Sequence, residues 1–155
     1  MVVGALPDAR FLLVCDGPLR ASLVGRARQM GLSESVKFAG TQSDVRPYLA
    51  AADFGVLTSK SEGSSNSLLE YMAMGLPVVA SAIPGNRELV EGVFFETGNP
   101  RDLAGKLLEL WSDPKRRDLM RQGNRQRALE YSPQRFAERA QSYYSKLVAK
   151  YSQGS

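Results

Sequence analysis

The stretch of sequence that decides the fold is residues 59–80, SKSEGSSNSLLEYMAMGLPVVA. It predicts a polar loop, a short helix, a glycine that ends the helix, and a buried strand. The helix is indicated by apolar residues at helical spacing, namely Leu68, Leu69, Met72 and Ala73. Gly75 stands where a left-handed C-terminal cap belongs, and Pro77 lies just beyond it. Residues 78–80 then read as a strand, so the segment predicts a loop and a helix that lead into a sheet.

The loop that opens this helix is a good place to bind an anion, because free backbone N–H groups and the positive end of the helix both face it. The loop residues are Gly63, Ser64, Ser65, Asn66 and Ser67. Two carboxylates, Glu62 and Glu70, bracket the loop and stand eight positions apart. A fully helical segment of that length spans roughly 12 Å. This separation suits two carboxylates that accept hydrogen bonds from sugar hydroxyls while backbone amides bind a diphosphate between them.

Each of these residues also has a purely structural interpretation. Ser67 and Glu70 fit a helix capping box, in which the glutamate returns to a backbone N–H and binds nothing else. Glu62 fits a solvated loop carboxylate. The apolar residues of the helix, Leu68 and Met72 among them, are expected to pack against the core rather than contact a ligand.

Length and composition agree with one domain, residues 1–151, followed by a short polar tail, residues 152–155. A chain of this size buries roughly 70% of its unfolded surface, which is enough for one core. The single cysteine, Cys15, excludes a disulfide framework and suits a reducing compartment. The apolar runs are short and the first residues do not read as a secretion leader. We therefore expect a cytoplasmic protein without a transmembrane span.

The sequence also argues against several classes of active site. It contains no histidine, which removes a histidine base, a Ser-His triad and histidine metal ligands. With only one cysteine, a zinc site is not expected either. Neither a G-x-x-x-x-G-K-S/T loop nor a complete G-x-G-x-x-G fingerprint is present, so ATP-dependent and dinucleotide chemistry lose their usual support.

The net charge of +4 is modest and partly local, and we expect no nucleic-acid partner. One segment holds many of the cations: Lys115, Arg116, Arg117, Arg121, Arg125 and Arg127. A solvated helix face explains such a segment. The alternative is a surface for anionic lipid, as in peripheral membrane contact, or for another acidic partner.

Strands and helices alternate along the chain, which is the pattern of a parallel sheet covered on both faces. The expected strands are residues 11–14, 36–39, 54–57, 78–80 and 93–95. Further helices are expected at residues 19–30 and 44–52 and after Asn99-Pro100, Asp113-Pro114 and Ser132-Pro133. We therefore expect an α/β fold, a Rossmann-like parallel sheet with helices on both faces in a single domain. The Glu62 loop would lie at the carboxyl end of the third strand, where open α/β sheets bind ligands.

At these residues the sequence resembles the donor-binding C-terminal domain of retaining glycosyltransferases of the GT-B fold, most closely glycosyltransferase family 4 (group 1). The family's motif has two glutamates separated by seven residues, then a helix and a glycine-proline turn into a valine-rich strand. The resemblance extends over residues 5–151. Other matching segments are FLLVCDGP at 11–18, VKFAG at 36–40, YLAAADFGVL at 48–57 and GNRELV at 85–90.

The resemblance implies a role for each candidate site residue. Glu62 would be the catalytic-site residue that faces the donor sugar, and Glu70 would accept hydrogen bonds from the ribose. The diphosphate would be held by residues Gly63, Ser64, Ser65, Asn66, Ser67 and Leu68. Gly40 and Thr41 would lie near the base, and Gly85 and Asn86 near the donor sugar. No metal or other cofactor is implied, and the donor would be of the UDP or GDP type.

The chain departs from the family pattern at its beginning and at two internal positions. In the family this domain opens with a strand, a glycine-arginine turn and a lysine-glycine pair, and the arginine and lysine hold the diphosphate. Here the sequence starts near the end of the helix that follows them, so we expect a domain truncated at its N-terminus, without the first strand, both cations and the preceding acceptor domain. Cys15 replaces a frequent glycine. Pro84 replaces part of a Gly-Gly pair and removes one backbone donor.

These features predict the donor-binding half of a retaining glycosyltransferase, which moves a sugar from a nucleoside diphosphate sugar to an acceptor hydroxyl. Without the two cations, we expect nucleotide binding on the order of millimolar and no transfer by the isolated chain. The alternatives are a stand-alone nucleotide-binding or assembly module without catalysis, and a folding fragment without activity. The expected partners are a nucleotide-sugar donor and an acceptor domain or partner chain.

Two structural expectations follow from the missing strand. It is central in the family's strand order, so the strands at Phe11 and Phe54 should either pair directly or leave a weakened seam filled by a partner chain. The final helix, residues 133–151, carries a wide aromatic stripe that would meet the other domain of a full enzyme, and self-association into a homo-oligomer should follow.

Overall fold

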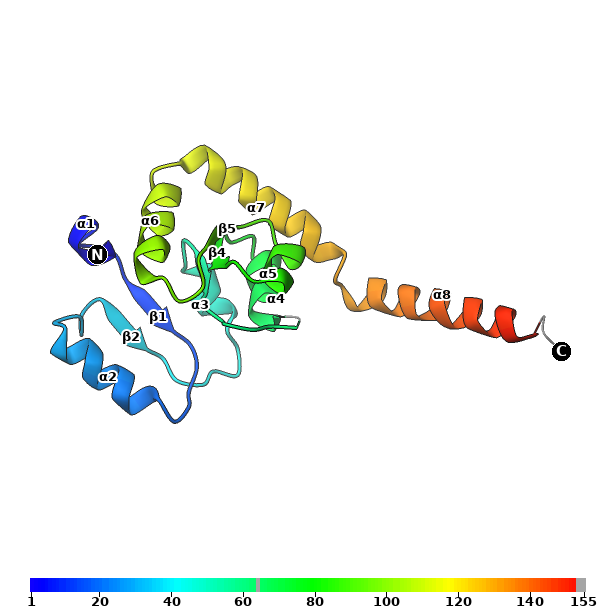
Figure 1. The fold of residues 1–155 in the computed structure, drawn as a ribbon, viewed down its shortest axis with the longest axis horizontal. Coiled ribbons are helices and arrows are strands. Elements are labelled where there is room, and N and C mark those ends of the chain that lie inside the picture. Colours follow the sequence, from blue (N-terminus) through cyan, green and yellow to red (C-terminus); the bar gives the residue numbers. More distant parts are fainter. Residues whose placement is uncertain (64, 153–155) are drawn as a thin grey trace.

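The computed structural model describes residues 1–63 and 65–152, and these form an α/β fold of parallel strands flanked by helices (Figure 1). The strands are β1 (Phe11–Leu13), β2 (Val36–Phe38), β3 (Gly55–Leu57), β4 (Val78–Ser81) and β5 (Val93–Phe95). The helices are α1 (Val2–Ala5), α2 (Arg20–Gln29), α3 (Arg46–Ala50), α4 (Asn66–Ala73), α5 (Pro84–Leu89), α6 (Pro100–Trp111), α7 (Pro114–Leu129) and α8 (Pro133–Ser152). Ser64 and most of the expected polar tail, 153–155, lie outside the described residues.

All five expected strands are confirmed, with ends that differ by at most one residue. The local signals that end or begin helices also hold. Gly75 has a φ of 66° just after α4, as a left-handed cap requires. The Asn99 side chain accepts from the backbone N–H groups of Arg101 and Asp102 at the start of α6. Asp113 does the same for Arg116 at the start of α7.

Helix α5 was not predicted, because Pro84 was interpreted only as the loss of a backbone donor. In the structure Pro84 is the first residue of this helix. The missing N–H costs nothing there, since the first helical amides have no partner within a helix, and the fixed φ of proline favours the helical conformation. The helix spans only six residues, which is too short for a helical pattern to stand out.

The strands form two separate parallel sheets. In one sheet β1 pairs with β2, and in the other β4 lies between β3 and β5. Among the described residues no ladder joins β1 to β3, so these strands do not pair directly, and a partner chain that fills the seam stays a prediction. Phe11 of β1 and Phe54 before β3 nevertheless pack against the same apolar cluster. The two sheets are therefore joined by side-chain packing where backbone hydrogen bonds are absent.

The core lies on the two faces of β4. Leu68 and Met72 of α4 pack on one face with Val78, and Leu110 of α6 packs on the other with Val79. All of these side chains are fully buried. The four residues of β4 are buried without exception, which is typical of the central strand of a parallel sheet covered on both sides.

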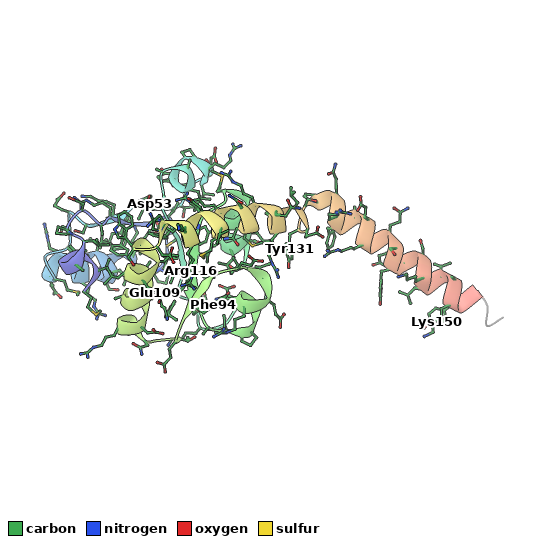
Figure 2. The ribbon with its side chains drawn as sticks, turned by 90° about the horizontal axis from the view of Figure 1, so that it is seen from above. Asp53, Phe94, Glu109, Arg116, Tyr131 and Lys150 are labelled. Atoms are coloured by element: carbon green, nitrogen blue, oxygen red, sulfur yellow. The ribbon has the colours of Figure 1, made fainter. Side chains whose placement is uncertain are left out.

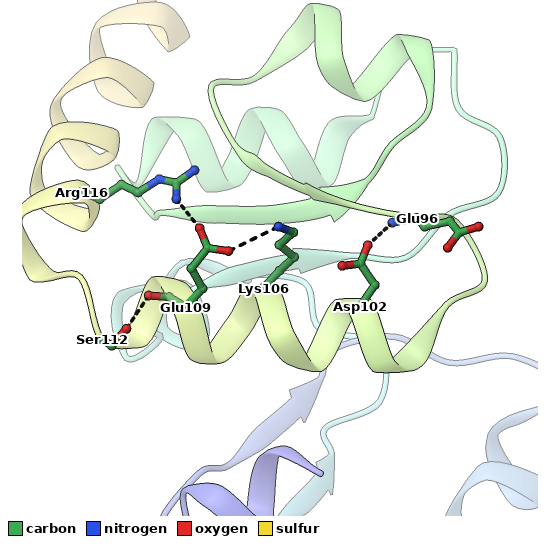
Figure 3. A network of polar contacts seen from close by, with 6 residues as sticks. All are labelled: Glu96, Asp102, Lys106, Glu109, Ser112 and Arg116. Atoms are coloured by element: carbon green, nitrogen blue, oxygen red, sulfur yellow. Dashed lines mark hydrogen bonds and ion pairs between the residues drawn. The ribbon is translucent and has the colours of Figure 1, made fainter.

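Polar contacts on α6 tie this helix to its neighbours in sequence (Figure 3). Asp102 accepts from the backbone N–H of Glu96 at 2.6 Å, which links the start of α6 to the end of β5. Glu109 accepts from Arg116 of α7 at 2.6 Å and from Lys106 at 3.3 Å. The Arg116 guanidinium, followed by Lys106, lowers the pKa of the Glu109 carboxyl. Exposed pairs of this kind orient helices more than they stabilise the fold.

The basic segment of α7 makes intramolecular contacts. Arg117 stacks over the Trp111 ring, 5.3 Å from its centroid. Arg127 donates to the carbonyl oxygen of Leu89 at 2.7 Å and so connects α7 to the end of α5. Together with the Arg116 pair, these contacts give the clustered cations a role in holding α7 against the domain.

Helix α8 extends away from the rest of the molecule in both views (Figures 1 and 2). Tyr131 marks the junction of α7 with α8, and Lys150 lies near the far end. The large apolar side chains of α8 are exposed: Phe136, Tyr143, Tyr144, Val148 and Tyr151. No helix within residues 1–63 and 65–152 is both long and apolar enough to cross a membrane.

Tyr71 of α4 lies at the seam between the sheets. Gly55 of β3 donates toward β4, to the carbonyl oxygen of Pro77, so the polar groups of Val56 point to the opposite edge. The Tyr71 hydroxyl donates to the Val56 carbonyl oxygen at 3.4 Å. Burial, followed by the charges of Glu70 and of Cys15 after β1, raises the pKa of Tyr71. This phenol therefore contacts the open edge of β3 near the end of β1.

We expect Tyr71 to ionise at a higher pH than a solvated tyrosine. The unfolded chain would release this proton first, so stability should fall as the pH rises above about 10 and through the folded-state pKa. Tyr71→Phe should remove the late component from an absorbance titration of phenolate and reduce the alkaline loss of stability. Tyr144→Phe, at an exposed position, is the control. Identical titration curves for both variants would contradict the half-buried position of Tyr71.

We also expect the chain to self-associate through the apolar stripe of α8. The double substitution Phe136→Ser and Tyr144→Ser should shift the protein toward the monomer in sedimentation velocity across a concentration series. Ser142→Ala with Ser145→Ala, on the opposite side of the helix by helical periodicity, should leave association unchanged. A wild-type chain that stays strictly monomeric at high concentration would overturn this expectation.

Candidate functional site

The candidate site lies at the carboxyl ends of β3 and β4, where the loop of residues 58–65 leads into α4 and a short connection leads into α5. This is the edge at which open α/β sheets bind ligands. Glu62 is half-buried within the loop and Glu70 is exposed on α4. The two carboxylates that the sequence singled out therefore belong to one loop-helix unit, as expected from their spacing.

The start of α4 differs from the capping-box alternative. The N-cap is Ser65, whose Oγ accepts from the Leu68 backbone N–H at 3.4 Å. Ser67 already lies inside the helix, so the capping box with Glu70 is wrong. The phase of the helix is set by Leu68 and Met72, which must both face the core. Glu70 is thereby left on the exposed side.

The first turn of α4 offers backbone donors to an anion. Among the described residues, the amides of Asn66 and Ser67 donate to no acceptor, whereas the Leu68 amide donates to the Ser65 Oγ. Two open amides at the positive end of a helix are suited to a phosphate. The Leu68 side chain is fully buried, which confirms its packing role. Ser64, also expected in this loop, is outside the described residues.

Glu62 is held by its own loop and by the start of α5. Its Oε1 accepts from the Ser59 hydroxyl at 2.6 Å. Gly85 lies directly against the loop backbone: a Cβ on this residue would be 2.8 Å from the Glu62 carbonyl oxygen and 3.1 Å from that of Gly63. Only glycine fits there without moving α5. The structure thus brings Glu62, Gly63 and Gly85 together.

Asn86, expected near the donor sugar, has a fully buried side chain. Its Nδ2 donates to the carbonyl oxygen of Ser81 at 3.0 Å and to the Ser81 hydroxyl at 3.1 Å. The side chain is therefore turned into the protein, toward the end of β4. Contact of Asn86 with a donor remains a prediction.

Gly40 and Thr41 follow β2 in the other sheet. Gly40 has a φ of 70°, and a Cβ there would lie 3.9 Å from a carboxylate oxygen of Asp16. The turns after β1 and β2 are thus neighbours at the carboxyl edge of the first sheet. Their role near a base stays a prediction.

A groove of about 430 Å³ runs beside Glu70. It is lined by residues of α4 and of the junction between α7 and α8: Leu69, Glu70, Ala73, Arg125, Ala128, Leu129, Tyr131, Ser132 and Pro133. A smaller cavity of about 170 Å³ lies beside Gly63 and Gly85, and Tyr131 lines this cavity too. Sequence reasoning missed Arg125 and Tyr131, because more than fifty positions separate them from Glu70. The helix break at Ser132-Pro133 was the only local signal at this place.

Within residues 1–63 and 65–152, no group of three or more acidic, histidine or cysteine side chains is arranged to hold a metal ion. Cys15 is an exposed free thiol. The polar groups of the site among the described residues are two carboxylates, the first amides of α4 and the hydroxyls of the loop.

Comparison with known proteins places this geometry in a family. Residues 2–113 match the family model described as glycosyl transferases group 1. The lipopolysaccharide core biosynthesis glycosyltransferase LpsE of Rhizobium meliloti (strain 1021) is 35% identical over 115 residues, which are 72% of this chain and 34% of LpsE. A D-inositol 3-phosphate glycosyltransferase of Salinispora arenicola (strain CNS-205) is 31% identical over 159 residues, 95% of this chain and 36% of the relative. The chain spans about a third of the length of these relatives.

Solved structures agree with the sequence match. HepE of Anabaena, determined in complex with UDP, superposes with a TM-score of 0.78 at 26% identity and covers 91% of this chain and 44% of HepE. Sucrose-phosphate synthase of Thermosynechococcus elongatus has the same fold, with a TM-score of 0.83 at 24% identity over 96% of this chain and 41% of the synthase. The chain belongs to the glycosyl transferases group 1 family, and its fold is that of a GT-B Rossmann-like domain.

Proposed function

We propose that this chain is the donor-binding part of a retaining glycosyltransferase of family 4, which transfers a sugar from a nucleoside diphosphate sugar to an acceptor hydroxyl. The observation that carries the proposal is the unit formed by the Glu62 loop and α4. Between its two carboxylates stand the amides of Asn66 and Ser67, which donate to no acceptor among the described residues. The similarity to HepE, determined with UDP, supports a uridine nucleotide.

In this proposal the diphosphate binds at the start of α4. The Asn66 and Ser67 amides and the helix dipole offset its charge. In the proposed step the bond between the anomeric carbon and the diphosphate breaks and its electron pair goes to the diphosphate. The acceptor oxygen forms the new bond to that carbon, and the acceptor proton passes to the departing diphosphate. Donors already aimed at the charge of the diphosphate stabilise the transition state, because they need no reorganisation. This proposed step does not involve a metal ion.

The carboxylates orient the two ends of the donor. Glu70 lies beside the groove of about 430 Å³ and would accept hydrogen bonds from the ribose hydroxyls. Glu62 lies at the other end of the loop, beside Gly63 and Gly85, and would accept from the sugar hydroxyls. A hydrogen bond to a charged group is worth about 1.5–3 kcal/mol, so each carboxylate contributes measurably to donor affinity.

The remaining parts of the reaction lie with a partner. The chain spans 34% of LpsE, and we propose that an acceptor-binding domain, on the same polypeptide or a separate one, supplies the acceptor site. The open edges of β1 and β3 support a further strand between the two sheets, as part of that partner. The isolated chain would then bind the donor without transferring sugar. The exposed free thiol of Cys15 suits a cytoplasmic setting.

NMR titration with UDP and UDP-glucose, up to several times the expected affinity on the order of millimolar, tests the assignment. Shifts should centre on residues 63, 65–67 and 70. Glu70→Gln should weaken the binding of both ligands by about tenfold, because the ribose is common to them. Glu62→Gln should weaken only the binding of UDP-glucose.

Glu34→Gln, on an exposed residue before β2, is the control and should change neither affinity. UDP should also raise the melting temperature, since a ligand that binds only the folded state stabilises it. Shifts centred elsewhere, or equal effects of the Glu62 and Glu70 variants on free UDP, would refute the assigned roles. Binding of both ligands without turnover, even with the acceptor domain added, would favour a nucleotide-binding module.

A further inference from the structure

A line of hydrogen bonds runs from α5 through β4 to the Glu62 side chain. Asn86 Nδ2 donates to both oxygens of Ser81, at 3.0 and 3.1 Å. The Ser81 hydroxyl donates to the Ser59 carbonyl oxygen at 2.6 Å. The Ser59 hydroxyl in turn donates to Glu62 Oε1 at 2.6 Å. These four residues, here called the Asn86 relay, connect a buried helix residue to a carboxylate of the site.

The chemistry of the groups fixes the direction of every bond in the relay. The carbonyl oxygens of Ser81 and Ser59 can only accept hydrogen bonds. The Asn86 side chain must therefore direct its amino group toward Ser81. The Ser81 hydroxyl must donate its proton to the Ser59 carbonyl oxygen and accept a hydrogen bond from Asn86. The Ser59 proton then goes to the carboxylate. No rotation of the Asn86 amide preserves its two bonds to Ser81, so this asparagine fixes the end of the line that lies in the core.

The burial of Asn86 indicates that its stabilising hydrogen bonds are those of its amino group. Asn86 and Ser81 are both fully buried, and Asn86 Oδ1 has no hydrogen-bond partner among the described residues. A buried amide oxygen without a partner is unfavourable, and an apolar residue of similar size would avoid that cost. The amino group has to compensate for it, and both of its bonds go to Ser81.

We propose that Asn86 is a positioning residue for Glu62, acting through Ser81 and Ser59. The inference rests on the proposed contact between Glu62 and the donor sugar. With Oε1 bonded to Ser59, the Glu62 carboxylate presents its second oxygen to a sugar hydroxyl. A site must hold such a group within about 0.5 Å of the productive geometry. The relay thus affects the sugar-dependent part of donor affinity and leaves the nucleotide-dependent part unchanged.

The chain contains a matched control for Asn86. Asn124 of α7 is also fully buried, and its Oδ1 also lacks a partner among the described residues. Its Nδ2 donates to a backbone carbonyl oxygen, that of Leu76, at 2.8 Å. Asn124→Ala therefore leaves a similar cavity and loses a similar bond without touching the relay.

Two measurements on the full chain test the proposal. The first is the NMR order parameter of the backbone amides of residues 59–63 without ligand, which should fall in Asn86→Ala and not in Asn124→Ala. The second is the ratio of the UDP and UDP-glucose dissociation constants by NMR. This ratio should fall several-fold in Asn86→Ala and in Ser59→Ala, recover in Ser59→Thr, and stay unchanged in Asn124→Ala. If Asn86→Ala does not fold, the Ser59 variants at the half-buried end of the relay still decide.

The outcomes separate the relay from the proposed function. If Glu62→Gln lowers the ratio but Asn86→Ala and Ser59→Ala do not, the relay is wrong and the proposed function stands. If the wild-type chain binds neither UDP nor UDP-glucose, the proposed function fails and the order parameters of residues 59–63 alone decide whether Asn86 holds the loop. Equal order parameters in the Asn86 and Asn124 variants would overturn the inference in either case.

Discussion

The burial of β4 on both faces is the constraint on which the rest of the structure depends. Its backbone pairs with β3 on one side and β5 on the other. Val78 packs with α4, and Val79 packs with α6. Full burial of such a side chain stabilises the fold by about 1.5–3 kcal/mol. A different helix packs on each face of the strand. The strand therefore contributes fully buried side chains to both apolar clusters.

The same strand transmits the geometry of the core to the site. Its last residue, Ser81, is fully buried and yet polar, and it stands where β4 meets the loop after β3. Its hydroxyl donates to the Ser59 carbonyl oxygen, three residues before Glu62. The loop is thus fixed near its start by a residue of the sheet, while Gly85 packs against its backbone at Glu62 and Gly63. Because β4 cannot shift without disturbing both clusters, the loop that is bonded to Ser81 is held in a fixed position.

The sequence predicted the features that depend on neighbours along the chain. The strands follow from short apolar runs, and the helix starts at Asn99 and Asp113 follow from side chains that reach the next amides. The sequence alone did not determine the N-cap of α4, since several serines near Ser65 can cap a helix equally well. The choice is made by Leu68 and Met72, which must face the core. The seam between the sheets was expected only from family resemblance, because no local pattern shows which strands pair.

The site was predictable to the extent that it is local. Glu62, Glu70 and the amides between them lie on one continuous segment, so spacing alone grouped them. Tyr131 entered the site from the far end of α7, and it lines both the groove beside Glu70 and the cavity beside Gly63. Helix α7 reaches this place because it packs on α4 and because Arg127 donates to the carbonyl oxygen of Leu89, the last residue of α5. A helix that is held by both site helices also positions the residue that borders both cavities, and only the folded chain brings these groups together.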